Sequence, residues 1–319
     1  MRTKDNTLRA HLDLTLAGLD EPTPSYRGKV RDVWTHHDEI LLLATDRISA
    51  FDVVLGTVPM KGQLLTEQAT FWLHKAADVV RTHFLERIDP QAMRCVKTTP
   101  LPVELVVRGY LAGSLLREPK HSRGAAYGLR IDPALADYAA LPTPIVTPTT
   151  KEAVGVHDQP CSPEDLIASN RVERRVLAEV IGIAQALFAM GQAHARTQGL
   201  LLVDTKYEFG LVGERVVLID EVHTADSSRY WRADSYATRL ANGEAPDMLD
   251  KERLRRWLLA GGFSGHGTPP VLDDDVRVDL ASHYWTLTET VLGRPFVPVE
   301  GDASARARAA VVRFLATGC

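Results

Sequence analysis

The segment LLLVDTKYEFGLVGERVVLIDEV, residues 200–222, carries the clearest fold signal in this chain. Branched and aromatic residues fill its first half, Gly213 interrupts the pattern, and RVVLIDEV resumes it. This arrangement predicts two β-strands joined by a tight turn. Because side chains alternate between the two faces of a strand, Asp204, Lys206 and Glu208 should lie in a row on one face.

The length of the turn decides which residue of the second strand faces Glu208. A two-residue loop places Glu208 opposite Ile219, whereas a three-residue loop with a bulge places it opposite Asp220. We expect the second register. Directly opposed side chains have Cβ atoms about 5 Å apart, and two carboxylates that close repel each other unless a cation lies between them. Hard oxygen ligands suit magnesium, and Lys206 suits a phosphate that the metal also contacts.

An ordinary amphipathic hairpin with a solvated charged face would show the same pattern, since charged strand faces are common. Six segments of the chain favour a functional site instead. They are YRGKVRDVW (26–34), LLLATDRISAFDVVLG (41–56), LPVELVVRGYLAGS (101–114), TPTTKEAVGVHD (147–158), VDTKYEFG (203–210) and LIDEVHTADSSRYW (218–231). In sequence order and over most of the chain, they resemble the signature segments of the phosphoribosylaminoimidazole-succinocarboxamide synthases, the SAICAR synthetase family of purine biosynthesis.

The composition indicates a globular, cytoplasmic protein. The chain has 319 residues, of which 45% are hydrophobic and 24% charged, so it can bury one large core or two coupled cores. We find no apolar run near the length of a membrane span, and the first residues lack the apolar core of a signal peptide. The net charge is −4 and the basic residues are scattered among acids, which argues against nucleic-acid binding.

The cysteines indicate neither a disulfide framework nor a zinc site. Cys95, Cys161 and Cys319 are odd in number, far apart and in no CxxC pair. We expect free thiols in a reducing compartment.

The N-terminal segment predicts a phosphate-binding hairpin. Residues 26–34 are expected to form one strand, His37-Asp38 a turn, and residues 39–46 the partner strand. Gly28 would let the backbone approach a ligand, and Lys29 and Arg31 would point the same way. Taken alone, this pattern is more often that of a solvated hairpin than of a phosphate site, and the segment is not a Walker loop. The resemblance implies that the segment covers the phosphates of ATP.

Residues 101–107 predict a buried strand. In ATP-binding folds of the type that the resemblance implies, the backbone of such a strand pairs with the adenine edge, which would place Glu104 near the nucleotide. Arg108 follows where the apolar run stops, and it could staple its own loop or hold a phosphate or carboxylate in a bidentate pair, to which Ser114 would add a hydroxyl. The resemblance implies that these last two residues contact the ribonucleotide substrate.

The chain departs from the family pattern at two positions. Met60 in VPMKG (58–62) stands where relatives carry the first glycine of a Pro-Gly-Lys-Gly turn, and Pro119 stands where they usually carry an aromatic residue. The first departure leaves open how Lys61 is presented. A helix is expected from residue 65 to about 82, with Phe71, Trp72 and Val79 on one side.

Two loops contribute weaker candidates. His157 and Asp158 either hold the amino-acid substrate or order their own loop, since a lone histidine is more often structural than catalytic. Asp226 and Arg229 either form a structural pair or, as the resemblance implies, Arg229 reaches a substrate anion.

A long helix is expected between residues 163 and 198, capped by Ser162 and interrupted near Ser169-Asn170. Three helices should follow residue 247, the last with an apolar stripe for the protein body or a second subunit. The resemblance implies an α+β fold with ATP in a cleft between an N-terminal antiparallel sheet domain, residues 1–110, and a larger α+β domain, residues 111–319, as in kinases and ATP-grasp enzymes. The oligomeric state, monomer or homodimer, stays open.

The resemblance also implies the reaction. ATP activates the carboxylate of the carboxylated aminoimidazole ribonucleotide as an acyl phosphate, and L-aspartate then displaces phosphate to give the succinocarboxamide, ADP and phosphate. A small-molecule kinase would use the same Mg-ATP site, and a non-catalytic nucleotide-binding protein would not need the acids. The assigned residues are Lys206, Glu208 and Asp220 for catalysis; Lys29, Arg31, Glu104 and Lys206 for ATP; Arg108, Ser114, His157, Asp158, Asp226 and Arg229 for the substrates; and Glu208 and Asp220 for magnesium.

Overall fold

The computed structural model describes residues 3–152, 158–249 and 251–316. It contains two compact units, each discontinuous in sequence. Unit 1 comprises Met1–Phe71, Phe84–Lys97 and Leu249–Cys319, and unit 2 comprises Trp72–His83 and Thr98–Met248. This division differs from the expected boundary after residue 110. The difference arises because β8 (Thr99–Tyr110) pairs with later strands of the chain, while the C-terminal helices belong to the unit of the N-terminal strands.

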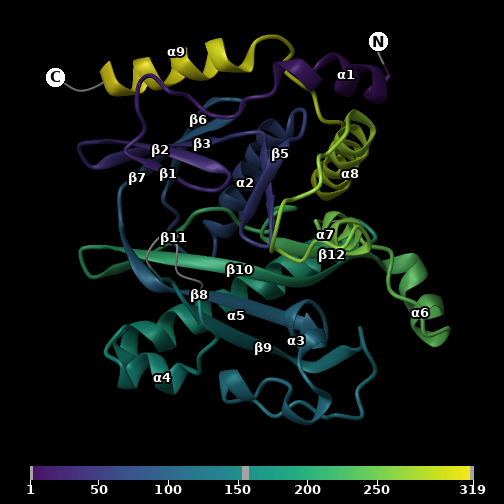
Figure 1. Cartoon of the computed structure of the whole chain (residues 1–319). Coiled ribbons are helices and arrows are strands. Elements are labelled where there is room, and N and C mark those ends of the chain that lie inside the picture. Colours follow the sequence, from purple (N-terminus) through teal and green to yellow (C-terminus); the bar gives the residue numbers. More distant parts are fainter. Residues whose placement is uncertain (1–2, 153–157, 250, 317–319) are drawn as a thin grey trace. The chain divides into compact units, whose positions relative to one another are not determined.

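Unit 1 contains a five-stranded antiparallel sheet in the order β1-β2-β3-β7-β6 and a separate β4–β5 hairpin. The strands are β1 (Tyr26–Arg27), β2 (Arg31–His36), β3 (Glu39–Ala44), β4 (Arg47–Ala50), β5 (Val53–Thr57), β6 (Phe84–Asp89) and β7 (Ala92–Val96). The helical elements with unit 1 residues are α1 (Lys4–Ala10), η1 (Leu12–Leu14), α2 (Lys61–Ala76), α7 (Glu252–Ala260), α8 (Asp274–Leu292) and α9 (Ala303–Ala316), and Figure 1 labels the α-helices.

The predicted turn at His37-Asp38 is confirmed, because His36 pairs with Glu39 across a two-residue loop. The single strand expected over residues 26–34 is wrong. Gly28 N donates to Arg31 O at 2.7 Å, so a tight turn separates β1 from β2. Lys29 therefore lies in a turn rather than within a strand.

Helix α2 begins and ends earlier than the sequence predicts. Its bounds are Lys61–Ala76, and Val79, expected on its packed side, is exposed. The helix does not continue because the next segment pairs with a strand. Leu218 N donates to Arg81 O and His83 N donates to Leu218 O, both at 2.9 Å.

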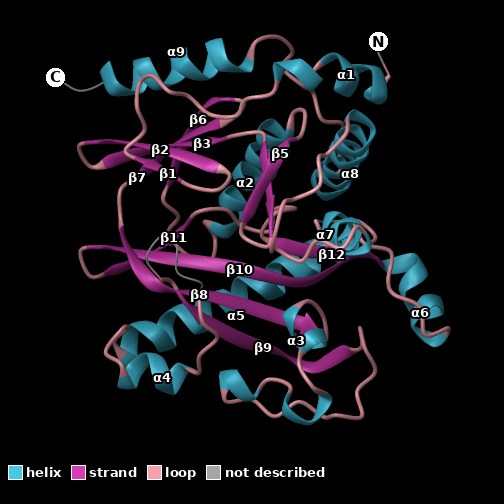
Figure 2. Ribbon diagram, viewed as in Figure 1, coloured by secondary structure: helices cyan, strands magenta, loops and turns pink. Residues whose placement is uncertain are grey.

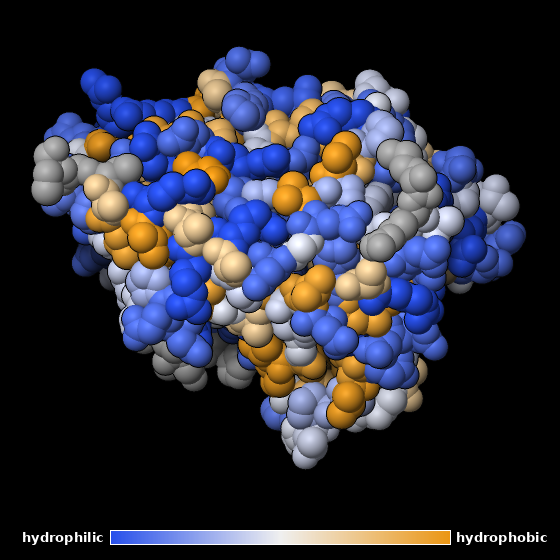
Figure 3. All heavy atoms as spheres, turned by 90° about the horizontal axis from the view of Figure 1, so that it is seen from above, coloured by the Kyte–Doolittle hydropathy of each residue, from blue (hydrophilic) through white to orange (hydrophobic). Residues whose placement is uncertain are grey.

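Helix α9 completes the core of unit 1. Its buried Ala307, Val311 and Phe314 form one hydrophobic cluster with residues such as Trp34 and Leu41 of the β2–β3 hairpin. The apolar stripe predicted for the last helix thus packs on the body of its own chain. On the face in Figure 3, hydrophobic residues lie in small groups among hydrophilic ones, as on the surface of a folded domain.

Unit 2 is built on an antiparallel sheet in the order β11-β10-β8-β9, with β12 also paired to β10. Figure 2 shows β8, β9 and β10 running side by side. The elements after β8 are α3 (Ser114–Arg117), η2 (Lys120–Ser122), η3 (Ala125–Tyr127), β9 (Ala140–Thr150), α4 (Pro163–Ala168), α5 (Arg174–Thr197), β10 (Leu200–Val212), β11 (Arg215–Ile219), β12 (Ser228–Arg232) and α6 (Ala233–Ala241).

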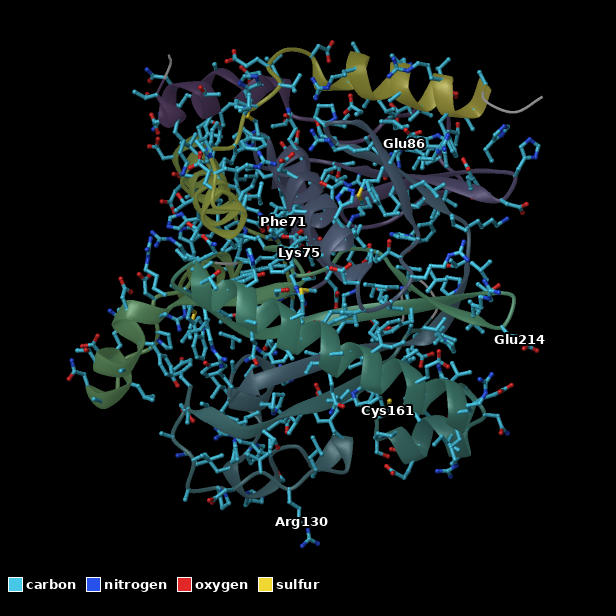
Figure 4. The ribbon with its side chains drawn as sticks, turned by 180° about the vertical axis from the view of Figure 1, so that it is seen from behind. Phe71, Lys75, Glu86, Arg130, Cys161 and Glu214 are labelled. Atoms are coloured by element: carbon cyan, nitrogen blue, oxygen red, sulfur yellow. The ribbon has the colours of Figure 1, made fainter. Side chains whose placement is uncertain are left out.

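The long helix region agrees with the prediction. Ser162 forms a capping box with Asp165 at the start of α4, and the chain breaks between Ala168 and Arg174 before α5. The helix α5 lies along the sheet in Figures 1 and 4 and packs on β10 and β8.

Among the described residues, α5 is the one helix long and apolar enough to cross a membrane by length and composition. This differs from the expectation of no such run, because its alanines raise the mean hydropathy. Buried Val180, Leu187 and Phe188 give the helix an apolar face, which is what a helix packed on a sheet requires. Core packing therefore explains its composition.

The hairpin of β10 and β11 has the register that we did not expect. Val212 pairs with Arg215 and Glu208 with Ile219, so the loop has two residues. Gly213, with φ +61°, fits the first position of such a loop. Asp220 follows the end of β11 with φ +62°, and its side chain therefore extends from a loop rather than from a paired position.

Candidate functional site

Strand β10 places Asp204, Lys206 and Glu208 in one row, as its alternation predicts. The strand lies inside its sheet, between β8 on one side and β11 and β12 on the other. Asp204 lies opposite Arg108, Lys206 opposite Val106, and Glu208 opposite Glu104 of β8. The row therefore receives charged partners from the neighbouring strand, and two charged clusters result.

The first cluster surrounds Lys206. Its Nζ lies 3.2 Å from Glu104 Oε1 and 3.7 Å from Asp220 Oδ2, and it also contacts Glu208 Oε1. The second oxygen of Glu208, Oε2, accepts from Lys151 Nζ. Lys151 follows β9, which pairs with β8 on the side away from β10. The sheet thus brings three carboxylates and two ammonium groups together.

The charges in this cluster set its pKa values. Burial raises the pKa of Glu104 to about 6; the charge of Lys206 opposes this effect, and the nearby carboxylate of Glu208 adds to it. Burial would also raise the pKa of Glu208, but the charges and hydrogen bonds of Lys206 and Lys151 lower it far more. For Lys206, burial opposes the charged form, yet the surrounding carboxylates raise its pKa well above the usual value.

The donor types of this cluster fit a hard divalent cation, since Glu104, Glu208 and Asp220 offer carboxylate oxygens. The ammonium of Lys206 lies among these carboxylates, so the position already holds a cationic group. In the described part of the chain, no group of three His, Cys, Asp or Glu side chains is arranged to hold a metal ion. A metal would therefore compete with the lysines for these oxygens.

The second cluster holds two arginines on one buried acid. Arg108 Nη1 lies 3.2 Å from Asp204 Oδ2, and Arg229 Nη1 lies 2.9 Å from the same oxygen. Arg108 also donates to Thr147 Oγ1 at 2.9 Å and to Ser114 Oγ at 3.0 Å. The structure thus brings together the three residues assigned to the ribonucleotide.

The arginine cluster places two guanidinium groups and one carboxylate in a largely buried position. Burial lowers the pKa of Arg108, Asp204 opposes this effect, and Arg229 adds to it. A Cβ atom on Gly113, whose φ is +62°, would come within 2.6 to 2.7 Å of the Arg229 guanidinium, so this glycine permits the close approach. Two guanidinium groups therefore meet at one carboxylate oxygen, with planar donors of the kind that bind oxyanions.

Hydrogen bonds from β10 and β12 fix the loop between β11 and β12 at His223. Tyr207 Oη lies 2.5 Å from His223 Nε2, and Tyr230 Oη donates to His223 O at 2.7 Å. Burial lowers the pKa of His223 to about 3, so its ring is neutral. This loop carries Asp220 and Asp226, the latter half-buried with its N–H on Thr224 Oγ1 at 3.3 Å.

The phosphate hairpin predicted at the N-terminus lies in unit 1. Lys29 contacts Asp52, and both side chains are more than half exposed. Asp52 belongs to the two-residue turn between β4 and β5, in which Phe51 and Asp52 have φ of +51° and +64°. Arg31 begins β2 opposite Ala44. Lys29 and Arg31 therefore remain predicted ligands of ATP.

The loop after β9 is described only in part. His157 lies outside the described residues. Asp158 is exposed, and its Oδ1 accepts from Glu152 N at 2.8 Å, which gives it a role in ordering the loop. Cys95 and Cys161 are free thiols as predicted, and Cys319 lies outside the described residues.

Comparisons with known proteins identify the family of this chain. Residues 24–266 match the family model described as SAICAR synthetase. The chain belongs to the SAICAR synthetase family. It is 45% identical over 281 residues to the phosphoribosylaminoimidazole-succinocarboxamide synthase of Cytophaga hutchinsonii, covering 87% of this chain and 90% of the relative. The Flavobacterium psychrophilum enzyme of the same name is 39% identical over 280 residues, covering 86% and 89%.

A solved structure shares the fold. The SAICAR synthase of Saccharomyces cerevisiae complexed with SAICAR superposes with a TM-score of 0.77 at 30% identity, covering 89% of this chain and all of that chain. The predicted family and the α+β fold class are confirmed. So is the prediction of an ATP-using carbon–nitrogen ligase of purine biosynthesis, and the small-molecule kinase is not favoured.

Two residues of the clusters are not among those assigned from the sequence. Asp204 shares the strand face of Lys206 and Glu208, so its position carried a signal, but its two arginine partners come from other strands. Lys151 stands in a segment that resembles the family, but its contact with Glu208 depends on the pairing of β9 with β8.

Proposed function

We propose that the two clusters on β10 are the two halves of the ligase site. The arginine cluster would bind the phosphate of the carboxylated aminoimidazole ribonucleotide, and the carboxylate–lysine cluster would bind Mg²⁺ and the phosphates of ATP. The observation that carries this proposal is the alternation of Asp204, Lys206 and Glu208 on one strand face, with arginines at one end and carboxylates at the other. Neighbouring positions on one face are about 7 Å apart.

The arginine cluster suits a phosphate monoester for three reasons. Arg108 and Arg229 supply planar donors that can bind phosphate oxygens in pairs. Asp204 holds both guanidinium groups, so little side-chain freedom is lost on binding. Ser114 adds a hydroxyl beside Arg108. A ribonucleotide bound there would extend its base carboxylate along the row toward Lys206.

The other half would serve the nucleotide. Glu208 and Asp220 are the proposed Mg²⁺ ligands, with Glu104 beside them, and Lys206, which lies among these carboxylates, would contact the phosphates. When bound, Mg²⁺ would neutralise charge on the transferred phosphoryl group. Lys29 and Arg31 of unit 1 and Asp158, Asp226 and His157 of unit 2 remain weaker proposals for contacts with ATP and the substrates.

The reaction proceeds in two transfers. An oxygen of the substrate carboxylate attacks the γ-phosphorus of ATP, ADP leaves, and an acyl phosphate forms. The amine of L-aspartate then attacks the carbonyl carbon, the carbon–nitrogen bond forms, and the carbon–oxygen bond to phosphate breaks. Lys206 would stabilise the charge that develops on the phosphoryl oxygens. Small-molecule substrates, an action in the cytoplasm and either a monomer or a homodimer fit this proposal.

The first experiment measures ADP release by the purified protein with Mg²⁺, ATP and the ribonucleotide, with and without L-aspartate, while mass spectrometry follows the product. We expect ADP and succinocarboxamide in equal amounts, and only with aspartate. ADP release without aspartate, together with a stable phosphorylated product, would instead indicate a kinase.

The variant Asp220→Asn then tests the metal assignment. It should lower turnover at least a hundredfold, the size expected for losing a ligand that stabilises transition-state charge, with the fold intact by circular dichroism. Glu214→Gln is the matched control, because Glu214 is an exposed acid at the tip of the same hairpin (Figure 4) and should leave turnover unchanged. Near-normal turnover in well-folded Asp220→Asn contradicts the assignment.

A further inference from the structure

Both carboxylate oxygens of Glu208 are occupied by lysines of the chain itself. The Nζ atom of Lys206 donates a hydrogen bond to Oε1, and the Nζ atom of Lys151 donates one to Oε2. Glu208 is the proposed metal ligand, so a divalent cation and these ammonium groups would compete for the same oxygens. Repulsion between a divalent cation and two ammonium groups on one carboxylate favours the displacement of one lysine when Glu208 binds a metal.

The two lysines differ in what holds them. Lys206 lies inside the sheet on β10, with Glu104 at 3.2 Å and Asp220 at 3.7 Å besides Glu208, and its side chain is 28% exposed. Lys151 stands beyond the end of β9, and its side chain is 41% exposed. A flexible side chain that borders solvent can leave a carboxylate at lower cost than one enclosed by three.

The backbone at Lys151 is fixed, so only its side chain needs to move. Lys151 N donates to Pro102 O at 3.2 Å, and Thr150 N donates to Gln159 O at 2.9 Å. Gln159 N in turn donates to Thr150 Oγ1 at 3.0 Å. A movement of Lys151 would therefore involve rotation of its side chain about a fixed backbone position beside the carboxylate cluster.

Charge supports an exchange at this point. With both lysines in place, the three carboxylates and two ammonium groups carry one net negative charge. When Lys151 leaves, two net negative charges remain, which a divalent cation neutralises. A lysine displaced in this way would still be anchored beside the carboxylate cluster, and its ammonium group would be available to the phosphates of a metal-bound nucleotide.

We propose that Lys151 is an exchangeable counter-ion of Glu208. Its ammonium group pairs with the Glu208 carboxylate before a divalent cation binds. When the cation binds, the side chain moves and the ammonium group pairs with a phosphate of the nucleotide. This inference rests on the proposed metal site at Glu208 and Asp220. Lys151 thus lowers the affinity for the free cation, with which it competes, and raises the affinity for the cation–nucleotide complex.

The test measures two affinities of the full-length protein. The first is the affinity for Mn²⁺ alone, from the relaxation of water protons. The second is the affinity for ADP in the presence of saturating Mn²⁺, from calorimetry. Lys151→Met removes the ammonium and keeps the length of the side chain, and Lys151→Arg keeps a cation. Lys120→Met is the matched control, because Lys120 is an exposed lysine of the same unit.

We expect Lys151→Met to bind Mn²⁺ about five- to tenfold more tightly than the wild type and ADP–Mn²⁺ about fivefold more weakly, as for one partly exposed charge. Lys151→Arg should restore both affinities toward wild type, and Lys120→Met should change neither. A purely structural role would weaken both affinities together.

Two results would overturn the inference, and they are distinguishable. If wild-type protein binds Mn²⁺, Asp220→Asn abolishes that binding, and Lys151→Met leaves it unchanged or weaker, the exchange is wrong while the metal site stands. If Asp220→Asn leaves Mn²⁺ binding unaffected, the metal site itself is wrong, and the exchange falls with it.

Discussion

Asp46 is a buried acid in unit 1 that accepts two backbone hydrogen bonds. Leu16 N donates to Oδ2 at 2.7 Å and Gly62 N to Oδ1 at 2.8 Å. Burial nevertheless raises its pKa from 3.8 to about 6, because desolvation outweighs these hydrogen bonds and the charges of Lys61 and Arg306. A raised pKa means that the folded chain binds this proton more tightly than the unfolded chain does. The stability it provides is therefore complete below pH 3.8 and is lost as pH rises through about 6.

The variant Asp46→Asn removes this titration. Between roughly pH 4 and pH 7.5, the free energy of unfolding of the wild type should fall by about 2 to 3 kcal/mol relative to that of the variant. Urea unfolding at several pH values measures the difference. Asp20→Asn, at a fully exposed acid, controls for the change in net charge. A difference between wild type and Asp46→Asn that stays constant, or grows as pH rises, would contradict the sign.

At the scale of elements, the turn of the β2–β3 hairpin has a backbone conformation that favours glycine, but a histidine occupies it. Exposed His37 takes the first position of a two-residue loop with φ +52°, a conformation that costs a residue with a Cβ about 1 to 2 kcal/mol. His37→Gly should raise the free energy of unfolding by about 0.5 to 1 kcal/mol, after the greater freedom of glycine in the unfolded chain is subtracted.

The matched control is Glu214→Gly in the β10–β11 loop. That loop also has two residues, but its positive φ is already taken by Gly213, and Glu214 is not among the described non-glycine residues with positive φ. This substitution should lower stability by a few tenths of a kcal/mol. Chemical denaturation measures both free energies of unfolding. If the two substitutions change them equally, backbone strain at His37 does not explain the effect of His37→Gly.

The same hairpins show which elements the sequence can predict. Alternation and turn residues are local signals, so the two hairpins and the Ser162 cap were predictable. The register of β10 and β11 was not, because loops of two and three residues both suit Gly213-Glu214 and differ only in how the strands pair. The end of α2 depends on the pairing of Arg81 and His83 with Leu218, far away in sequence.

The candidate site follows the same rule. Residues in one strand, such as Lys206 and Glu208, could be placed together from alternation alone, and the family resemblance supplied Arg108, Ser114 and Arg229. The partners that set the charge of the site, Asp204 between two arginines and Lys151 on Glu208, come from strand pairing over long sequence separations. No local pattern contains that information.

At the scale of the whole molecule, unit 1 is assembled from the two ends of the chain. The cluster that joins them includes Trp34, Leu41 and Leu43 from the N-terminal strands and Val311 from α9. A core of this kind makes the C-terminal helix part of the same cooperative structure as strands near the N-terminus. A defect in α9 should therefore appear in β2 and β3.

Two adjacent valines of α9 allow a matched test. Val311 is fully buried, whereas Val312 is 50% exposed. Val311→Ala should lower the free energy of unfolding of unit 1 by about 2 kcal/mol, from lost burial and the cavity left behind. Val312→Ala should change it by less than about 0.5 kcal/mol, because alanine favours the helix. Native-state hydrogen exchange locates the effect: amide protection in Val311→Ala should fall in β2 and β3 more than in β8 and β10 of unit 2. An equal fall in both sets of strands would mean that the chain unfolds as a single cooperative body, and no change in β2 and β3 would mean that α9 adds little to their core.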